Sequence, residues 1–151
     1  MAKSYFSTVF DESAEAVWAA VRDFGNYEWA GVTAETLIED GRPGDAVSAV
    51  RRVRTPERSM RQRLLAHSDL ERSYTYELCE PVPMPVRNYQ ATLRVSPIVD
   101  GNRAFVEWWA SFDCAPDEQD RWTSYFANDG FARWLASLRE RLAGRRASSR
   151  S

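Results

Sequence analysis

The chain has 151 residues, of which 44% are apolar, 13% aromatic and 28% charged, a composition that fits one globular domain with its own core. Its net charge of −2 offers no strong field to nucleic-acid phosphates, so the sequence argues against nucleic-acid binding. No apolar run approaches the roughly 20 residues of a membrane-spanning helix, and the first residues lack the apolar segment of a secretory signal. We therefore expect a soluble, cytoplasmic protein with no membrane span.

Several common catalytic groups are missing from the chain. His67 is the only histidine, and Cys79 and Cys114 do not form a metal-binding spacing. The GxSxG, GxGxxG and GxxxxGK[ST] motifs of hydrolases and nucleotide-binding proteins are absent. Lys3 is the only lysine, which makes Schiff-base chemistry from a buried lysine improbable. We expect neither a metal nor another cofactor.

The N-terminal segment alternates between strand and helix patterns. Residues 4–10 are β-branched and aromatic and are expected to form a strand. Residues 13–24 carry apolar side chains at helical spacing, with Ser13 as the N-cap. Residues 26–31 have room for one further helical turn, and residues 32–39 alternate as a second strand does.

The middle of the chain repeats with a period of two, which is typical of antiparallel strands with one apolar and one wetter face. The segments Thr55-Pro56-Glu57 and Asp100-Gly101 are predicted to be hairpin turns. The strands expected from this pattern are 46–55, 58–67, 73–78, 89–96 and 105–113.

The C-terminal segment changes to helical spacing, with one broad apolar stripe from Trp122 to Leu142. We expect one long helix there, a single domain over residues 1–143, and a disordered tail over residues 144–151. A sheet with one apolar face and one long amphipathic helix implies an α+β fold in which the helix lies across that face. Strong curvature of the sheet would leave a cavity between them.

Six segments, in order, carry a resemblance to a known group of proteins. They are DESAEAVWAAVRDFGNYEWAG, GDAVSAVRRV, RQRLLAHSD, YTYELCEPVPMPVRNYQATLRVSP, VEWWASFD and GFARWLASL. The set resembles the START-like (SRPBCC, Bet v 1-like) superfamily, in particular its bacterial polyketide cyclase/dehydrase branch. The resemblance implies the helix-grip fold: a curved antiparallel sheet of about seven strands around a long C-terminal helix, with two short helices after the first strand. It also implies a hydrophobic ligand and, in an enzyme, a cofactor-independent cyclase or dehydratase (a lyase).

One short segment also resembles plant abscisic-acid receptors. The run PVRNYQA is similar to the latch of those receptors. Their gate loop of small residues is replaced here by RTPERSMR, and Val32 stands where the receptors carry the lysine that receives the hormone's carboxylate. The hormone-receptor interpretation is therefore contradicted at the positions that carry it.

Arg51 is the chief charged exception on an apolar strand face. Alternation places Val47, Ala49, Arg51 and Val53 on one side, and the resemblance also places an arginine there in many relatives. Burying an unpaired charge costs several kcal/mol. Arg51 therefore pairs with a protein carboxylate, reaches solvent at the rim, or contacts an anionic or carbonyl-bearing ligand.

Other inward polar and aromatic side chains complete the candidate site. Arg51, Tyr76 and Tyr89 are the candidate catalytic residues, since a guanidinium and phenol hydroxyls polarise a carbonyl and stabilise a developing oxyanion. Tyrosines on strands also serve as core residues, so each has a purely structural alternative. The candidate ligand-binding residues are Arg51, Val53, Gln62, Tyr74, Tyr76, Tyr89, Ala91, Trp108, Trp122, Phe126 and Gly130.

Some residues are expected to lie outside that site. Trp134, Leu135 and Leu138 are predicted to be core residues of the last helix. His67 shares parity with the outward residues of its strand and is expected at the surface or the strand end. No pair of inward carboxylates is available for hydrolytic acid–base work.

The leading hypothesis is binding of a hydrophobic, aromatic or polyketide-like small molecule, with its cyclisation or dehydration as the reaction of an enzyme. One alternative is a non-catalytic carrier or sensor of a lipid or metabolite. Another is an interaction module whose own aromatic side chains fill the cavity. The protein is expected to be a monomer or a homodimer.

Overall fold

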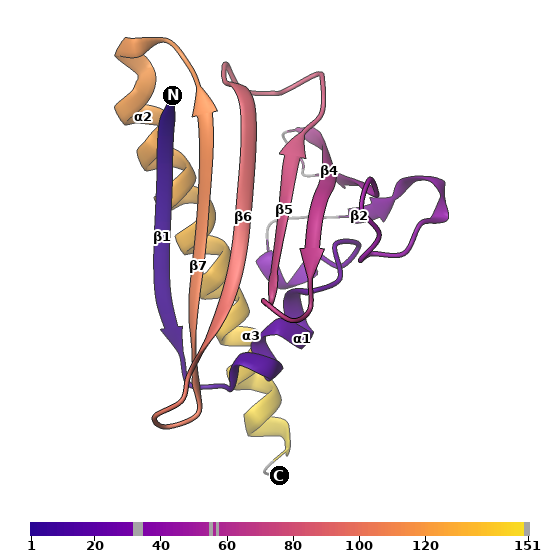
Figure 1. The fold of residues 1–151 in the computed structure, drawn as a ribbon, viewed down its shortest axis with the longest axis vertical. Helices are drawn as coiled ribbons and strands as arrows, with labels where there is room; N and C mark the ends of the chain where they lie inside the picture. The colour runs from indigo at the N-terminus through magenta and orange to yellow at the C-terminus, as the bar shows by residue number, and fades with distance from the viewer. Residues whose placement is uncertain (32–34, 55, 57, 150–151) are drawn as a thin grey trace.

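A computed structural model describes residues 1–31, 35–54, 56 and 58–149. Its elements follow the order expected for a curved sheet and a long last helix (Figure 1). They are β1 (Ala2–Phe10), α1 (Ala14–Val21), η1 (Glu28–Ala30), β2 (Glu35–Ile38), η2 (Glu39–Gly41), β3 (Val50–Arg54), β4 (Ser59–Ser68), β5 (Ser73–Leu78), β6 (Arg87–Ile98), β7 (Arg103–Asp113), η3 (Pro116–Glu118), α2 (Gln119–Ser124), η4 (Tyr125–Ala132) and α3 (Arg133–Ser149).

The seven strands form one antiparallel sheet in the order β1-β7-β6-β5-β4-β3-β2. The C-terminal helical segment runs across one face of the sheet, beside β1, β7 and β6 (Figure 1). The short α1 and η1 lie between β1 and β2 in the chain, and the Ser13 hydroxyl caps α1 by accepting from the Ala16 amide at 3.2 Å. The predicted α+β helix-grip architecture is confirmed.

The period-two pattern correctly identified the inner face of the sheet over β5, β6 and β7. Its buried residues include Tyr74, Tyr76, Tyr89, Trp108 and Phe112. Burying these aromatic side chains against the helix is the main source of stability in such a two-layer fold, at about 25 cal/mol per Å² of apolar surface.

His67 lies at the end of its strand, as predicted, but the prediction that it faces outward is wrong. A β-bulge lies between Leu64 and Ala66, so that Leu64 pairs with Tyr76 while His67 pairs with Tyr74. The extra residue reverses the parity of the strand beyond it. His67 consequently lies on the inner face at the end of β4, with its side chain 8% exposed and its ring 5.4 Å from that of Trp18.

Two predicted strands are shorter in the structure. β3 begins at Val50, and the preceding residues form turns, so Val47 is 53% exposed instead of facing inward. β2 spans Glu35–Ile38 of the predicted 32–39, and residues 32–34 lie outside the described residues. Thr55 and Glu57 of the predicted hairpin turn are also outside them, although β3 and β4 pair antiparallel as that hairpin requires.

The C-terminal helix differs from expectation in two ways. Between α2 and α3 the backbone is a π-helix, η4, with i→i+5 hydrogen bonding in place of the α-helical pattern. In addition, α3 continues through Ser149, so residues 144–149 of the tail expected to be disordered are helical. Good helix formers such as arginine and alanine allow a helix to continue past its last buried turn. No helix among the described residues has the length and apolar character needed to cross a bilayer.

Candidate functional site

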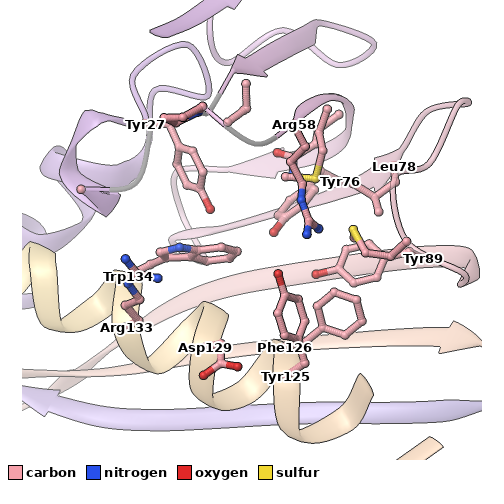
Figure 2. A pocket seen from close by; sticks show the side chains of 16 residues that line it. Tyr27, Arg58, Tyr76, Leu78, Tyr89, Tyr125, Phe126, Asp129, Arg133 and Trp134 are labelled. Atoms are coloured by element: carbon pink, nitrogen blue, oxygen red, sulfur yellow. The ribbon is translucent and has the colours of Figure 1, made fainter. Parts of the chain in front are cut away.

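A cavity of about 450 Å³ lies between the inner face of β3, β4, β5 and β6 and the helix at η4 and the start of α3. Figure 2 shows the side chains around it. Its lining includes apolar residues from both layers, namely Val53, Met60, Leu78, Met84, Phe126 and Trp134. A cavity of this size and character fits a small organic molecule with a mostly apolar body.

The cavity forms where the helix no longer packs directly on the sheet. On one side, the ring of Trp108 stacks on that of Phe131 at a centroid distance of 4.8 Å, and the two layers are in contact. On the other, the sheet curves away towards β3, and the rings of Tyr27 and Trp134 at 5.9 Å border the open space. The expected cavity between sheet and helix is therefore present.

Tyrosine hydroxyls are the main polar groups of the cavity. Four tyrosine side chains converge on the same space (Figure 2): Tyr27 from the residue before η1, Tyr76 from β5, Tyr89 from β6 and Tyr125 from η4. Burial raises the pKa values of Tyr27, Tyr76 and Tyr89 above that of an ordinary tyrosine. These three phenols consequently stay neutral at physiological pH and are able to donate hydrogen bonds.

The hydroxyls of Tyr27 and Tyr76 differ in their hydrogen bonding. The indole N–H of Trp108 donates to the Tyr76 hydroxyl oxygen at 3.2 Å, which leaves the Tyr76 proton for another acceptor. The Tyr27 hydroxyl is buried and has no hydrogen-bond partner among the described residues. A buried hydroxyl without a partner costs free energy, and an oxygen atom of a bound ligand would remove that cost.

Arg51 is fully buried, and it donates hydrogen bonds to the Gln62 side chain and the Phe24 carbonyl oxygen, neither of which is a carboxylate. Its guanidinium carbon lies 4.0 Å from the ring centres of both Phe24 and Tyr27 and 5.1 Å from that of Tyr76. Its Nε donates to Gln62 Oε1 at 2.6 Å. Desolvated cation–π contacts of about 2 kcal/mol offset part of the cost of burying the charge.

Arg51 therefore acts on the cavity through its neighbours, because it stacks against Tyr27 and Tyr76 and does not itself line the space. Gln62 does line the cavity, and its amide oxygen is already used by Arg51. The NH₂ group of the Gln62 amide remains available to donate a hydrogen bond to a ligand. The Gln62 side chain thus adds a further donor to those of the tyrosines.

Charged side chains stand at the edge of the cavity. Arg58 comes from the sheet side, and Figure 2 shows its guanidinium directed towards the hydroxyls of Tyr76 and Tyr125. Asp129 and Arg133 come from the helix side. All three are exposed, so they contribute to the entrance and not to the buried interior.

The π-helix explains which helical residues reach the cavity. Tyr125, Phe126, Asp129, Arg133 and Trp134 line it, and among them Tyr125, Asp129 and Arg133 follow at four-residue intervals while Asp129 and Trp134 are five residues apart. A π-turn is wider than an α-turn, so residues five apart share a face there. Such segments are rare and are frequent at functional sites.

The structure places some of the candidate ligand-binding residues at the cavity and others elsewhere. Arg51 lies against the lining, Tyr74, Ala91 and Trp108 are buried in the inner face of the sheet, and Trp122 lines a second hollow. A Cβ at Gly130 would lie 3.3 Å from the Trp134 ring, so this glycine makes room for that ring. The candidates that line the cavity are Val53, Gln62, Tyr76, Tyr89 and Phe126.

Sequence reasoning missed several lining residues. Trp134 lines the cavity, in contrast to its predicted role as a pure core residue. Leu78 lies two residues after Tyr76 on β5, so the alternation of the strand already placed its side chain on the same inward face and could have identified it as a lining residue. Tyr27 and Arg58 lie outside regular strands and α-helices, where no periodicity indicates a direction.

A second polar cluster lies at the end of β4, away from the cavity lining. The ligand atoms of Asp45, His67 and Asp69 are within 4.8 Å of one another. The guanidinium of Arg22 bonds both carboxylates, at 3.3 Å to Asp45 and at 3.0 and 3.1 Å to Asp69. An arginine that occupies the carboxylates makes this group a structural ion pair.

The chain matches a family model described as "Polyketide cyclase / dehydrase and lipid transport" over residues 1–147. No protein with a curated functional description matches it. A solved structure from Thermobifida fusca is 29% identical, with a TM-score of 0.82 and 93% of each chain covered. One from Bacillus cereus is 26% identical, with a TM-score of 0.81 and coverage of 93% of this chain and 94% of that one.

More distant structures share the fold alone. The di-domain ARO/CYC protein BexL of the BE-7585A biosynthetic pathway is 14% identical, with a TM-score of 0.78 over 95% of this chain and 47% of that one. Norcoclaurine synthase of Thalictrum flavum is 12% identical, with a TM-score of 0.74 and 95% of each chain covered. The match over nearly the whole sequence and the helix-grip fold together show that the chain belongs to the polyketide cyclase/dehydrase and lipid transport family.

Proposed function

We propose that the protein binds a hydrophobic, aromatic or polyketide-like small molecule in the cavity between the sheet and η4. The observation that carries this proposal is the convergence of four tyrosine hydroxyls on an apolar space of about 450 Å³. The apolar walls favour a ring system, and the hydroxyl donors favour a ligand that carries carbonyl oxygens.

The proposal includes cyclisation or dehydration of that molecule. Tyr27 and Tyr76 would donate to a carbonyl oxygen and stabilise the enolate or alkoxide that develops there. Their raised pKa values suit them as hydrogen-bond donors and not as phenolate bases. Gln62 and Tyr89 would position the substrate chain so that its reacting carbons meet. Arg51 is a positioning residue, because it contacts Gln62 and the rings of Tyr27 and Tyr76.

The second candidate function is a non-catalytic carrier or sensor of a lipid or metabolite. It is favoured by the absence of a buried base among the described lining residues: Asp129 is the one carboxylate there, and it is exposed. A carrier needs the apolar volume and the donors but no proton acceptor. In this case the hydroxyls would serve recognition alone.

Native mass spectrometry of the purified protein tests the binding proposal directly. We expect a bound small molecule with an aromatic absorption spectrum that is released on unfolding. Incubation of the released molecule with fresh protein then separates the two functions. Conversion to a product smaller by one water, or to a cyclised isomer, supports an enzyme that Tyr76→Phe inactivates with little loss of binding. Unchanged recovery, with Tyr76→Phe only weakening binding, supports the carrier.

A further inference from the structure

A second hollow, of about 370 Å³, adjoins the cavity at its entrance. The two spaces share Arg58, Tyr125 and Asp129 in their linings. The two spaces therefore adjoin at these three side chains. We call this second hollow the mouth pocket.

The mouth pocket has a different chemical character from the cavity. Where the cavity is walled mainly by aromatic and aliphatic residues, the mouth pocket presents Arg58, Arg121 and the carboxylate of Asp129 together with the polar side chains of Ser124 and Asn128. The ring of Trp122 forms its apolar part, with the Arg121 guanidinium 4.9 Å from the ring centre. Guanidinium, hydroxyl and amide groups are the donors with which proteins bind anionic oxygen atoms.

The two arginines differ in position. Arg121 lies 3.3 Å from Glu118 and its side chain is 70% exposed, which places it at the outer side of the mouth pocket. Arg58 stands at the junction of the two spaces, and Figure 2 shows its guanidinium beside the hydroxyls of Tyr76 and Tyr125. Asp129 approaches from the helix side of the junction.

We propose that the mouth pocket binds the carboxylate of an amphiphilic ligand whose apolar body occupies the cavity. Arg58 binds the carboxylate at the junction, the Tyr125 hydroxyl lies beside it, and Arg121 adds long-range attraction from the outer side. This inference rests on the proposed function, since it needs an apolar body in the cavity. It adds the charge class of the ligand, which the cavity by itself leaves open.

Fluorescence titration with two matched probes tests the inference. Pyrenebutyrate and pyrenebutanol share the same ring system and chain and differ in the terminal carboxylate. We expect the wild-type protein to bind pyrenebutyrate about tenfold more tightly, as one charge-assisted contact allows. Arg58→Gln should remove this preference and leave pyrenebutanol binding within about twofold. Arg121→Gln should weaken pyrenebutyrate binding by a smaller factor, and added salt should narrow the difference between the probes.

Arg103→Gln is the matched control, because Arg103 is an exposed arginine at the start of β7 and lines neither space. It should leave both affinities unchanged, and circular dichroism should show all variants folded. Equal wild-type affinity for the two probes, or equal losses for both in Arg58→Gln, would overturn the inference while leaving the cavity's binding function in place. Failure of both probes to bind the wild-type protein would contradict the proposed function and the inference together.

Discussion

The inner face of the sheet has two regions, one that the helix covers directly and one that faces the cavity. Along β1 and β7 the helix packs directly on it, and the ring pairs Trp108–Phe131 and Phe112–Phe126 have centroid distances of 4.8 and 5.1 Å. Along β3, β4 and β5, and at Tyr89 of β6, the same alternation of side chains faces the cavity. We call them the packed region and the open region.

The difference teaches that an apolar, inward-facing pattern does not by itself distinguish core from binding site. Both regions present large aromatic side chains at alternate positions. In the packed region the rings contact rings of the helix, whereas in the open region the Tyr27 hydroxyl, which has no partner among the described residues, borders the cavity. Unpaired buried polar atoms also occur at Trp29, Tyr74 and Trp122, which do not line the cavity, so the distance between the two layers distinguishes the regions and the unpaired atom does not.

The largest expected effect lies in the packed region. Trp108→Ala should lower the free energy of unfolding by about 3–5 kcal/mol, because it removes a fully buried indole and leaves a cavity that the neighbours cannot fill. Urea denaturation measures this loss. Trp109→Ala is the matched control on the outer face and should cost about 1 kcal/mol. Equal losses in the two variants would mean that the two faces of β7 do not differ as described.

Arg51, at the edge of the open region, should give the next largest effect. Arg51→Ala should lower the free energy of unfolding by about 3 kcal/mol, since it empties the space between Phe24 and Tyr27 and leaves the Gln62 oxygen without its donor. Arg51→Met keeps the volume without the charge and should cost clearly less. Denaturant titration of both variants separates packing from charge. An equal loss in Arg51→Met would show that the charge itself is required.

The third effect depends on pH and lies outside both regions. Hydrogen bonds from Arg22, Trp18 and His67 hold the pKa of Asp69 well below its ordinary value. An acid with a depressed pKa contributes stability above its unfolded pKa, of about 4, and loses it as pH falls through the folded pKa. Asp69→Asn should therefore lower the Tm at pH 7, and the gap to wild type should shrink as the pH is lowered towards 2.

Thermal melts across this pH range provide the measurement. Asp100→Asn is the control, because Asn-Gly keeps the chemistry of the β6–β7 turn and Asp100 lies outside the network. A gap between wild type and Asp69→Asn that is independent of pH would contradict a role for the carboxylate charge.

The smallest effect on stability is expected for Tyr27→Phe. Its hydroxyl has no partner among the described residues, so its removal should change the free energy of unfolding by less than about 0.5 kcal/mol. Binding should respond differently: affinity for pyrenecarboxaldehyde should fall, while affinity for methylpyrene should not. Tyr5→Phe, which removes an outer-face bond to Glu107, should change neither affinity. Loss of stability in Tyr27→Phe without loss of aldehyde binding would assign this residue to the packed region.

The fold was largely predictable from the sequence, and the candidate site only in part. Alternation over β5, β6 and β7 identified Tyr76, Tyr89 and Trp108 as inward-facing, because side-chain direction in a strand follows from the backbone alone. It did not show that Tyr76 and Tyr89 line the cavity while Trp108 is sealed beneath the helix. That distinction depends on the distance between the two layers.

Local irregularities caused the remaining errors. The bulge after Leu64 reversed the direction of His67, and the π-helix brought Tyr125 and Trp134 to the cavity. A bulge or a π-turn depends on hydrogen bonds that tertiary packing selects, so a sequence pattern of fixed period does not reveal it.

By itself, the sequence determined the helix-grip architecture, the inner face of the sheet and the position of an arginine, Arg51, on an apolar strand face. Only the tertiary structure decided that Arg51 is held by aromatic rings and Gln62 behind the lining, and that Arg58 stands at the entrance. The physical reason is the distance along the chain over which each feature is determined. Periodicity arises from the local backbone, whereas the partner of a charge and the walls of a cavity are set by segments that meet only after the sheet has curved around the helix.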